Sequence, residues 1–184
     1  ALTALSVIIE KYIDRFLLLP GEEPARKYKL FNALAALAPP GAGGLRLDLY
    51  REWSDFLKEV RNPLGAHPRE HLARALMEGA AFVTRRKLEE LDHAGIADRR
   101  LVMVGGPAES PVWPRIVAEV TGHELLLLHG QNAGAMGAAL LAAVGAGLYR
   151  DERQAFAAMS REGLSISPDP AAVRKYEEIF HEQA

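Results

Sequence analysis

Residues 101–122 read LVMVGGPAESPVWPRIVAEVTG, and this stretch decides the fold. Its first four residues form an uninterrupted apolar run, which predicts a strand buried on both faces. Gly105 and Gly106 then allow the backbone to turn sharply. Ser110 is a good N-cap, Pro111 suits the first position of a helix, and the final glycine is a helix stop. The stretch therefore predicts a strand, a glycine turn and a helix from about residue 110 to residue 121.

The next part of the chain repeats this pattern. Residues 125–128 form a second apolar run, and Asn132 is placed to cap a helix that runs to about Gly147. Strand, helix, strand and helix at this spacing predict right-handed parallel crossovers in an α/β sheet. The last of these helices consists mainly of alanine and glycine and falls short of the roughly 20 strongly apolar residues that a membrane span needs. We interpret it as a tightly packed core helix.

The first part of the chain is rich in helical patterns. Apolar residues recur at helical spacing over residues 3–18. A second helix is expected from about Pro24 to the Pro39-Pro40-Gly41 stop, with one face formed by Tyr28, Phe31, Leu34 and Leu37. The longest helix opens at His67-Pro68 and ends at Gly95. Its predicted buried face consists of Leu72, Leu76, Gly79, Ala80, Val83, Leu88 and Leu91.

Three other segments have weaker patterns. Leu45, Leu47 and Leu49 alternate with polar residues, which is typical of a half-buried strand. Residues 51–60 are ambiguous, with a short helix as our expectation. The tail has apolar residues at helical spacing over residues 173–180. It is predicted to dock as a closing helix or to face a partner subunit, as in a homodimer.

Composition excludes several classes of function. The chain has 184 residues, no cysteine and a formal net charge of −2. Disulfides, thiolate metal sites and cysteine nucleophiles are therefore excluded, which fits a cytoplasmic protein. The charge gives no electrostatic case for nucleic acid or an anionic membrane as partner. His67 and His71 have a spacing that can chelate a metal, but no HExxH motif accompanies them, and we predict no metal site.

The glycine turn is the candidate site for chemistry. Two glycines at the carboxyl end of a buried strand let a ligand approach the backbone, and a helix N-terminus beyond them favours phosphate. A double glycine after a strand is, however, often only a tight turn. The motif is not GxGxxG, because Pro107 stands where a glycine should fall, and this disfavours a Rossmann-type dehydrogenase. The chain also lacks GxxxxGK[ST], which excludes a P-loop NTPase on motif grounds.

Longer segments carry a family resemblance. The stretch VGGPAESPVWPRIVAEVTG, followed after one strand by AGAMGAALLAAVGAGLY, resembles the C-terminal domain of the FGGY family of carbohydrate kinases, which includes xylulokinase and glycerol kinase. YKLFNALAALAPPGAGGL and HPREHLARALMEGAAF extend the likeness over about residues 28–150. The resemblance implies an α/β, ribonuclease-H-like domain of the actin and hexokinase type, truncated at its N-terminal strands. In that interpretation residues 1–66 are a helix-rich lead-in, 67–150 a nucleotide-side α/β core and 151–184 C-terminal helices.

The resemblance also implies a reaction and a site. Kinases of this family transfer the γ-phosphoryl group of ATP, with Mg²⁺, to a sugar or polyol hydroxyl. By the family pattern Gly105, Gly106, Pro107 and Ala108 would lie near the adenosine and α-phosphate. Ser110 and Pro111 would lie near the adenine, and Trp113 is a packing anchor or borders the nucleotide. The helix of residues 133–147 would pack behind the turn through its small residues, Gly134, Gly137, Ala138, Ala142 and Gly145.

Two departures from the family pattern limit these expectations. Relatives usually carry a third glycine where this chain has Pro107, which lacks an N–H donor. Residues 49–65, LYREWSDFLKEVRNPLG, stand where many relatives carry a Gly-Glu-Arg segment. The family's catalytic aspartate and most sugar contacts would lie in an absent N-terminal domain, since Asp48, Asp55, Asp92 and Asp98 match no catalytic motif. We therefore expect no catalytic residue here and no activity from this chain alone; the alternative is a kinase-derived, non-catalytic domain in assembly or regulation.

Overall fold

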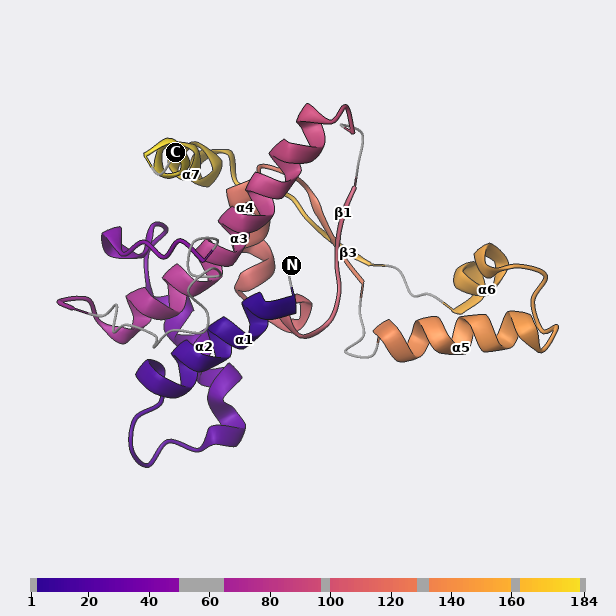
Figure 1. Cartoon of the computed structure of the whole chain (residues 1–184), viewed down its shortest axis with the longest axis horizontal. Helices are drawn as coiled ribbons and strands as arrows, with labels where there is room; N and C mark the ends of the chain where they lie inside the picture. The colour runs from indigo at the N-terminus through magenta and orange to yellow at the C-terminus, as the bar shows by residue number, and fades with distance from the viewer. Residues whose placement is uncertain (1–2, 50–64, 97–99, 129–132, 160–162, 183–184) are drawn as a thin grey trace.

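The computed structural model describes residues 3–49, 65–96, 100–128, 133–159 and 163–182. Most of these residues are helical, and a small sheet lies beside the helices (Figure 1). The N-terminal elements are α1 (Thr3–Tyr12), the π-helical turn η1 (Ile13–Leu17), the 3-10 turn η2 (Pro24–Arg26), α2 (Lys27–Leu37) and the 3-10 turn η3 (Ala42–Gly44). The later elements are α3 (Arg69–His93), β1 (Leu101–Met103), η4 (Gly106–Glu109), α4 (Trp113–Thr121), β2 (Leu125–Leu127), α5 (Ala133–Gly145), α6 (Glu152–Met159), β3 (Leu164–Ile166) and α7 (Pro170–His181).

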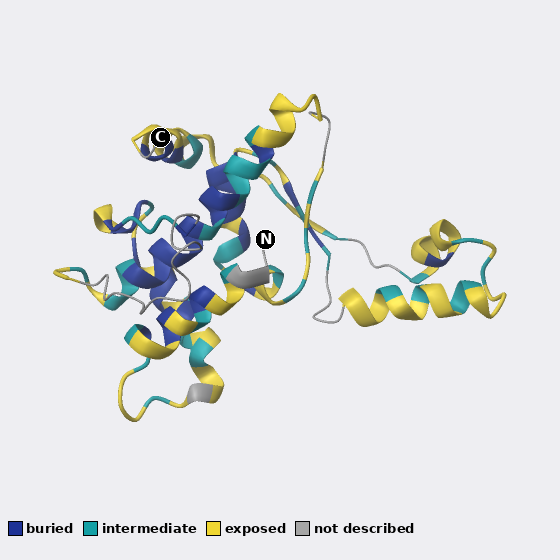
Figure 2. Cartoon of the chain, in the orientation of Figure 1, coloured by how far each residue is buried: buried dark blue, intermediate teal, exposed yellow. Residues whose placement is uncertain are grey.

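Helix α3 is the centre of the packed body. It contacts α2, η1 and η3 along its N-terminal half and α4 further along, and its middle turns are buried (Figure 2). The predicted face is confirmed at Leu72, Leu76, Gly79, Val83 and Leu88. Two predicted positions differ, because Ala80 is only partly buried and Leu91 is exposed. The helix ends as predicted, with Gly95 just beyond it at φ +78°.

The sheet has three strands among the described residues, in the order β1-β2-β3. β1 pairs parallel with β2, as predicted for a crossover through α4, and Leu101 lies opposite Leu125. β3 pairs antiparallel with β2 in the segment where only C-terminal helices were expected, so that expectation was wrong. The prediction that the first strand is buried on both faces was also wrong, since Val102 is 50% exposed. One face packs on the helical body and the other is open.

The first fifty residues confirm two predicted helices and correct one strand. In α2 the buried residues are Phe31, Leu34 and Ala35, because Tyr28 and Leu37 point outward. Residues 45–48 have no regular secondary structure, Leu49 lies in a turn, and the segment passes over α3 without pairing as a strand among the described residues. The carbonyl oxygen of Leu47 lies only 2.7 Å from where a Cβ on Gly79 would stand. Direct packing on α3 therefore replaces strand pairing, and the short helix expected at 51–60 lies outside the described residues.

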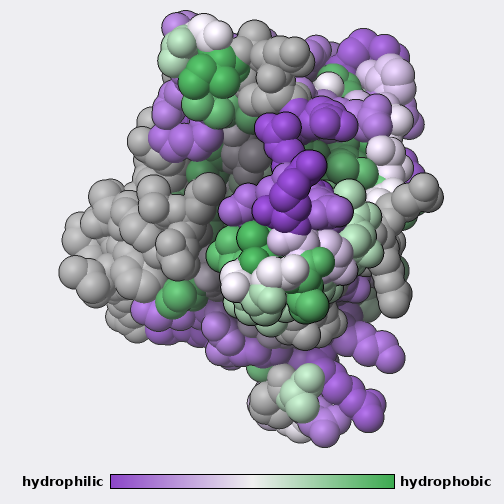
Figure 3. Space-filling model, turned by 90° about the vertical axis from the view of Figure 1, so that its right-hand side faces the viewer, coloured by the Kyte–Doolittle hydropathy of each residue, from purple (hydrophilic) through white to green (hydrophobic). Residues whose placement is uncertain are grey.

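Helices α5 and α6 pack against each other and extend away from the body (Figure 1). No described residue of α5 is buried, and nothing lies within 4 Å of a Cβ added at Gly134, Gly137 or Gly145. The expectation that this helix packs behind the glycine turn is therefore wrong for this structure. Viewed from the α5–α6 end, hydrophobic side chains lie open beside hydrophilic ones (Figure 3). None of the described helices combines the length and hydropathy needed to cross a membrane.

Helix α7 closes the body, as one of the two readings of the tail predicted. Asp169 caps it by accepting a hydrogen bond from the Ala171 N–H at 2.7 Å. Its buried face includes Phe180, which stacks on Phe82 with ring centroids 5.9 Å apart. The guanidinium of Arg85 lies 4.3 Å from the centroid of the Phe180 ring, so the tail is held by aromatic and cation–π contacts.

Candidate functional site

The glycine turn begins with a conformation that only glycine adopts readily. Gly105 follows β1 with φ +81° and ψ −164°, a region almost closed to residues that carry a Cβ. η4 then continues the chain, and the Ala108 N–H donates to the Gly105 carbonyl at 3.0 Å. The Ser110 N–H donates to the Pro107 carbonyl at 3.2 Å. The turn is therefore a compact, hydrogen-bonded unit between β1 and α4.

The outer surface of this turn is open. Gly106 and Pro107 are exposed, and Gly105 and Ala108 are partly buried. A Cβ added at Gly106 would meet nothing within 4 Å, and the backbone there has no positive φ. The described chain therefore has no steric need for glycine at position 106. The missing side chain leaves the backbone bare toward solvent, which is the kind of surface a ligand can approach closely.

Ser110 is tied to the protein itself. Its side chain is buried, and its hydroxyl donates to Oδ1 of Asn32 at 2.7 Å. The same oxygen accepts hydrogen bonds from the N–H groups of Val112 at 3.3 Å and Trp113 at 3.0 Å. A hydroxyl has one donor and two acceptor positions, so all of its hydrogen-bonding capacity is used. The prediction that Ser110 is the N-cap was wrong, because Val112 holds that position; Ser110 accepts the first N–H groups from two residues further back.

The start of the following helix differs from the prediction. α4 begins at Trp113, so Pro111 precedes the helix and Pro114 occupies its first turn. Two N–H groups at this helix start are taken by Ser110, and Pro114 has none. The expectation that this helix start favours phosphate is therefore wrong for Val112, Trp113 and Pro114, none of which offers a free N–H. A ligand at this site would rely chiefly on the backbone of the turn.

Trp113 serves as the packing anchor, one of its two predicted roles. Its ring meets Phe31 of α2 edge-on, with centroids 5.9 Å apart. Together with the bond from Ser110 to Asn32, this contact fastens the start of α4 to α2. The sequence pattern did not predict the role of Asn32, which lies 78 residues before its partner. Its place on α2, one residue after a predicted core phenylalanine, was the only available signal.

The histidines and the aspartate considered as metal ligands or catalytic acids form hydrogen bonds within the protein. Nδ1 of His67 and Nδ1 of His71 are 3.3 Å apart and share a hydrogen bond. The described residues contain no group of three histidine, aspartate or glutamate side chains that could hold a metal ion. Asp48 accepts from Nη1 of Arg86 at 3.3 Å. Trp53, Asp55, Asp98, His129 and Asn132 lie outside the described residues.

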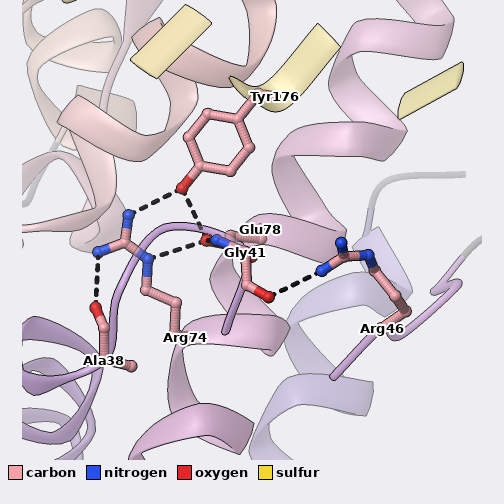
Figure 4. A network of polar contacts seen from close by, with 6 residues as sticks. All are labelled: Ala38, Gly41, Arg46, Arg74, Glu78 and Tyr176. Atoms are coloured by element: carbon pink, nitrogen blue, oxygen red, sulfur yellow. Dashed lines mark hydrogen bonds and ion pairs between the residues drawn. The ribbon is translucent and has the colours of Figure 1, made fainter. Parts of the chain in front are cut away.

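A buried polar cluster ties together three parts of the body (Figure 4). Oε1 of Glu78 accepts from the Gly41 N–H at 2.9 Å, from Nε of Arg74 at 2.9 Å and from the hydroxyl of Tyr176 at 2.6 Å. Arg74 also donates to the Tyr176 hydroxyl at 2.8 Å and to the Ala38 carbonyl at 3.4 Å. Burial, with the negative charge of Glu78, raises the pKa of Tyr176 far above its usual range.

This cluster is structural, and no pattern in the sequence predicts it. Arg74 and Glu78 lie four residues apart on α3, the spacing of a surface ion pair, yet both are buried. Their charges are compensated by hydrogen bonds from α7 and from the segment between α2 and η3. The cluster thus fixes α3, α7 and the Pro39-Pro40-Gly41 stop relative to one another. The cluster stabilises the helical body against which β1 and the glycine turn lie.

Comparison with known proteins places this architecture in a family. Residues 33–146 match the model of the C-terminal domain of the FGGY family of carbohydrate kinases. The chain is 33% identical over 116 residues to the xylulose kinase of Bacillus subtilis (strain 168), covering 63% of this chain and 23% of that protein. It is 38% identical over 108 residues to the ribulokinase of Mycolicibacterium smegmatis, covering 58% and 19%.

Solved structures agree with that match. The crystal structure of xylulose kinase from Rhodospirillum rubrum superimposes with a TM-score of 0.70 at 29% identity, covering 98% of this chain and 36% of that chain. Plasmodium falciparum glycerol kinase, solved with ADP, gives a TM-score of 0.68 at 13% identity over 97% of this chain and 36% of that chain. The second likeness concerns the fold alone. This chain spans about a third or less of the length of each relative named here.

Proposed function

This chain belongs to the FGGY family of carbohydrate kinases, and from that premise we propose that its glycine turn binds the adenosine side of ATP or ADP. The predicted contacts are the backbone of Gly105, Gly106, Pro107 and Ala108, with Pro111 at the edge. The observation that carries the proposal is the bare backbone at Gly106, next to a glycine-only conformation at Gly105. Ser110, whose hydroxyl is fully used within the chain, would hold the turn instead of touching the adenine.

The parent reaction would be phosphoryl transfer from ATP to a sugar or polyol hydroxyl. Bound Mg²⁺ would neutralise charge on the transferred phosphoryl group. The cation would enter with the nucleotide, whose phosphates are ligands that Mg²⁺ commonly uses. The part of the reaction assigned to this chain is to bind and orient the nucleotide. The general base and most sugar contacts would come from residues outside this chain, so the chain alone is expected to be inactive.

Titration of the 184-residue chain with ATP and with ADP tests the proposal. We expect saturable binding with a Kd on the order of 1 mM by calorimetry, with chemical-shift changes at the amides of Gly105 and Gly106. Gly106→Ala is the decisive variant, since the added methyl meets nothing in the protein but blocks close approach to the backbone. Affinity should fall about tenfold without loss of stability.

The matched control is Gly137→Ala, the same change in α5, which should bind like wild type. A folded wild-type chain that gives neither heat nor shifts at millimolar nucleotide would overturn the proposal. Equal affinity in wild type and Gly106→Ala would overturn the placement of the ligand at this turn.

Pro107 favours a second candidate, a kinase-derived domain that has lost nucleotide binding and acts in assembly or regulation. Proline cannot donate a hydrogen bond, so one donor toward a phosphate is missing at this position. Pro107→Gly restores that donor and separates the two candidates. Nucleotide binding that appears only in Pro107→Gly would favour the non-catalytic domain, whereas similar binding by both proteins would show that the proline is tolerated.

A further inference from the structure

The Ser110 hydroxyl joins three groups from two parts of the chain. Its proton goes to Oδ1 of Asn32, and its two lone pairs receive the N–H groups of Val112 and Trp113. A hydroxyl proton rotates freely about the C–O bond unless an acceptor fixes its direction. In this structure the acceptor that fixes it lies on α2. The orientation of the Ser110 hydroxyl, and of the lone pairs that accept from the start of α4, therefore depends on a residue outside the turn.

The glycine turn has two ends, and they are held differently. At its N-terminal end β1 is paired with β2, which fixes the backbone up to Met103. At its C-terminal end the chain is held by the Ser110 hydroxyl and by the edge contact between Trp113 and Phe31. The partners in both contacts, Asn32 and Phe31, are residues of α2. The conformation of residues 105–110 is thus set by the sheet at one end and by α2 at the other.

We propose that Asn32 is a positioning residue for the nucleotide turn. By accepting the Ser110 proton it turns both lone pairs toward the helix start and holds the end of the turn in its binding conformation. Without this acceptor the buried hydroxyl must find another partner, and the turn samples further conformations. A ligand then binds only the fraction of molecules that keep the competent turn, so its apparent Kd rises in proportion. The ligand in this inference rests on the proposed function, whereas the effect on the turn does not.

Two substitutions at position 32 separate the hydrogen bond from the packing. Asn32→Leu keeps a similar size but removes the acceptor, and Asn32→Asp keeps an acceptor oxygen. Amide hydrogen exchange in the nucleotide-free chain reports the hydrogen bonds to Ser110 directly. In Asn32→Leu the amides of Val112 and Trp113 should exchange about tenfold faster than in wild type. In Asn32→Asp they should exchange at the wild-type rate.

Nucleotide affinity gives the second readout. Asn32→Leu should raise the Kd for ATP about fivefold, and Asn32→Asp should leave it unchanged. Lys29→Ala, an exposed change on the same helix, controls for effects of α2 in general. Phe180→Leu, on the buried face of α7, controls for lost stability, because it should lower the unfolding midpoint without changing the Kd or the exchange at Val112 and Trp113.

The outcomes are separable. If Asn32→Leu leaves the exchange of Val112 and Trp113 at the wild-type rate, Asn32 does not hold the turn and the inference is overturned. If exchange rises but wild type and variant bind ATP equally, Asn32 serves the start of α4 alone and its positioning role is overturned. If Phe180→Leu weakens binding as much as Asn32→Leu, the effect is one of stability and the inference falls. If wild type binds no nucleotide, the proposed function fails, while the exchange rates still decide whether Asn32 positions the turn.

Discussion

Helix α5 is far more apolar than helix α3, yet α3 is the one that is buried. α3 contains charged residues throughout, yet most of its middle section is buried, including Arg74 and Glu78. α5 has no charged residue at all, yet none of its residues is buried. The difference lies in the neighbours, because α2, η3, α4 and η1 surround α3 whereas α5 packs on α6. Burial in this molecule follows from the surfaces available to a helix and cannot be read from its hydropathy.

The largest loss of stability is expected from a change in the buried polar cluster of Arg74, Glu78 and Tyr176. Glu78→Ala should lower the free energy of unfolding by about 3–5 kcal/mol, because it leaves the Arg74 guanidinium buried and unpaired. Urea denaturation followed by circular dichroism measures the loss. The control is Glu152→Ala on the exposed surface of α6, with an expected change within about 0.5 kcal/mol. A loss below about 1 kcal/mol in Glu78→Ala would mean that the cluster does not hold the body together.

A pair of identical leucine truncations sharpens the contrast. Leu76 on α3 has no exposed surface, and Leu76→Ala should cost about 2–5 kcal/mol through lost burial and the cavity left behind. Leu141 on α5 is 63% exposed, and Leu141→Ala should change stability by less than about 0.5 kcal/mol. Chemical denaturation of both variants under one set of conditions makes the comparison. Similar losses at the two positions would show that α5 is buried in the isolated chain.

Glycine-to-alanine changes should have opposite signs in the two helices. In α3, a Cβ at Gly79 would lie 2.7 Å from the carbonyl oxygen of Leu47, so Gly79→Ala should cost about 1–3 kcal/mol. In α5, Gly137 has open space around it and a helical backbone, so Gly137→Ala should strengthen the helix by about 0.5–1 kcal/mol. The first is measured by urea unfolding and the second by amide exchange within α5. A neutral Gly79→Ala would contradict the close passage of residues 45–49 over α3.

The regions around α3 and around α5 also differ in how well the sequence predicts their structure. Periodicity alone placed α1, α2, α3 and α7, because each has apolar residues that repeat every three to four positions and terminal glycine, proline or capping residues. It also placed β1, the glycine turn and β2 in the correct order. It could not predict the neighbour that each face would meet, so α5 was assigned to the core and Val102 to a two-sided strand.

The candidate site was predictable in its local part only. Gly105 and the hydrogen bonds that Ser110 accepts at the start of α4 follow from backbone chemistry that operates within a few residues. The link from Ser110 to Asn32, and the link from Glu78 to Tyr176, join positions 78 and 98 residues apart. Such pairs leave no periodic trace in one sequence. β3 was missed for a related reason, since three residues are too short for alternation to be recognised.

The contributions of two acidic residues to stability should depend on pH in opposite senses: Glu119 in the packed body and Asp151 beside α6. Glu119 on α4 is buried, and its ion-pair partner among the described residues is Arg115 at 3.9 Å. Burial raises the pKa of Glu119 despite the nearby positive charges of Arg115 and Arg74. A raised folded-state pKa means that its stabilising contribution is complete below the unfolded pKa and is lost as pH rises through the folded value. Glu119→Gln should therefore be more stable than wild type at pH 7, by about 0.5–1 kcal/mol, and should lose this advantage near pH 4.

Asp151, before α6, gives the opposite sign. The backbone N–H of Gln154 donates to its carboxylate at 2.8 Å, and this bond, with the Arg150 guanidinium, lowers its pKa. Its contribution is therefore present above the unfolded pKa and is lost as pH falls through the folded value. Asp151→Asn should speed amide exchange in α6 at pH 7 and match wild type in acid. The Glu119→Gln prediction is measured by urea unfolding at pH 7 and near pH 4. If Glu119→Gln is less stable than wild type at pH 7, the charge of Glu119 is compensated as well as that of Glu78.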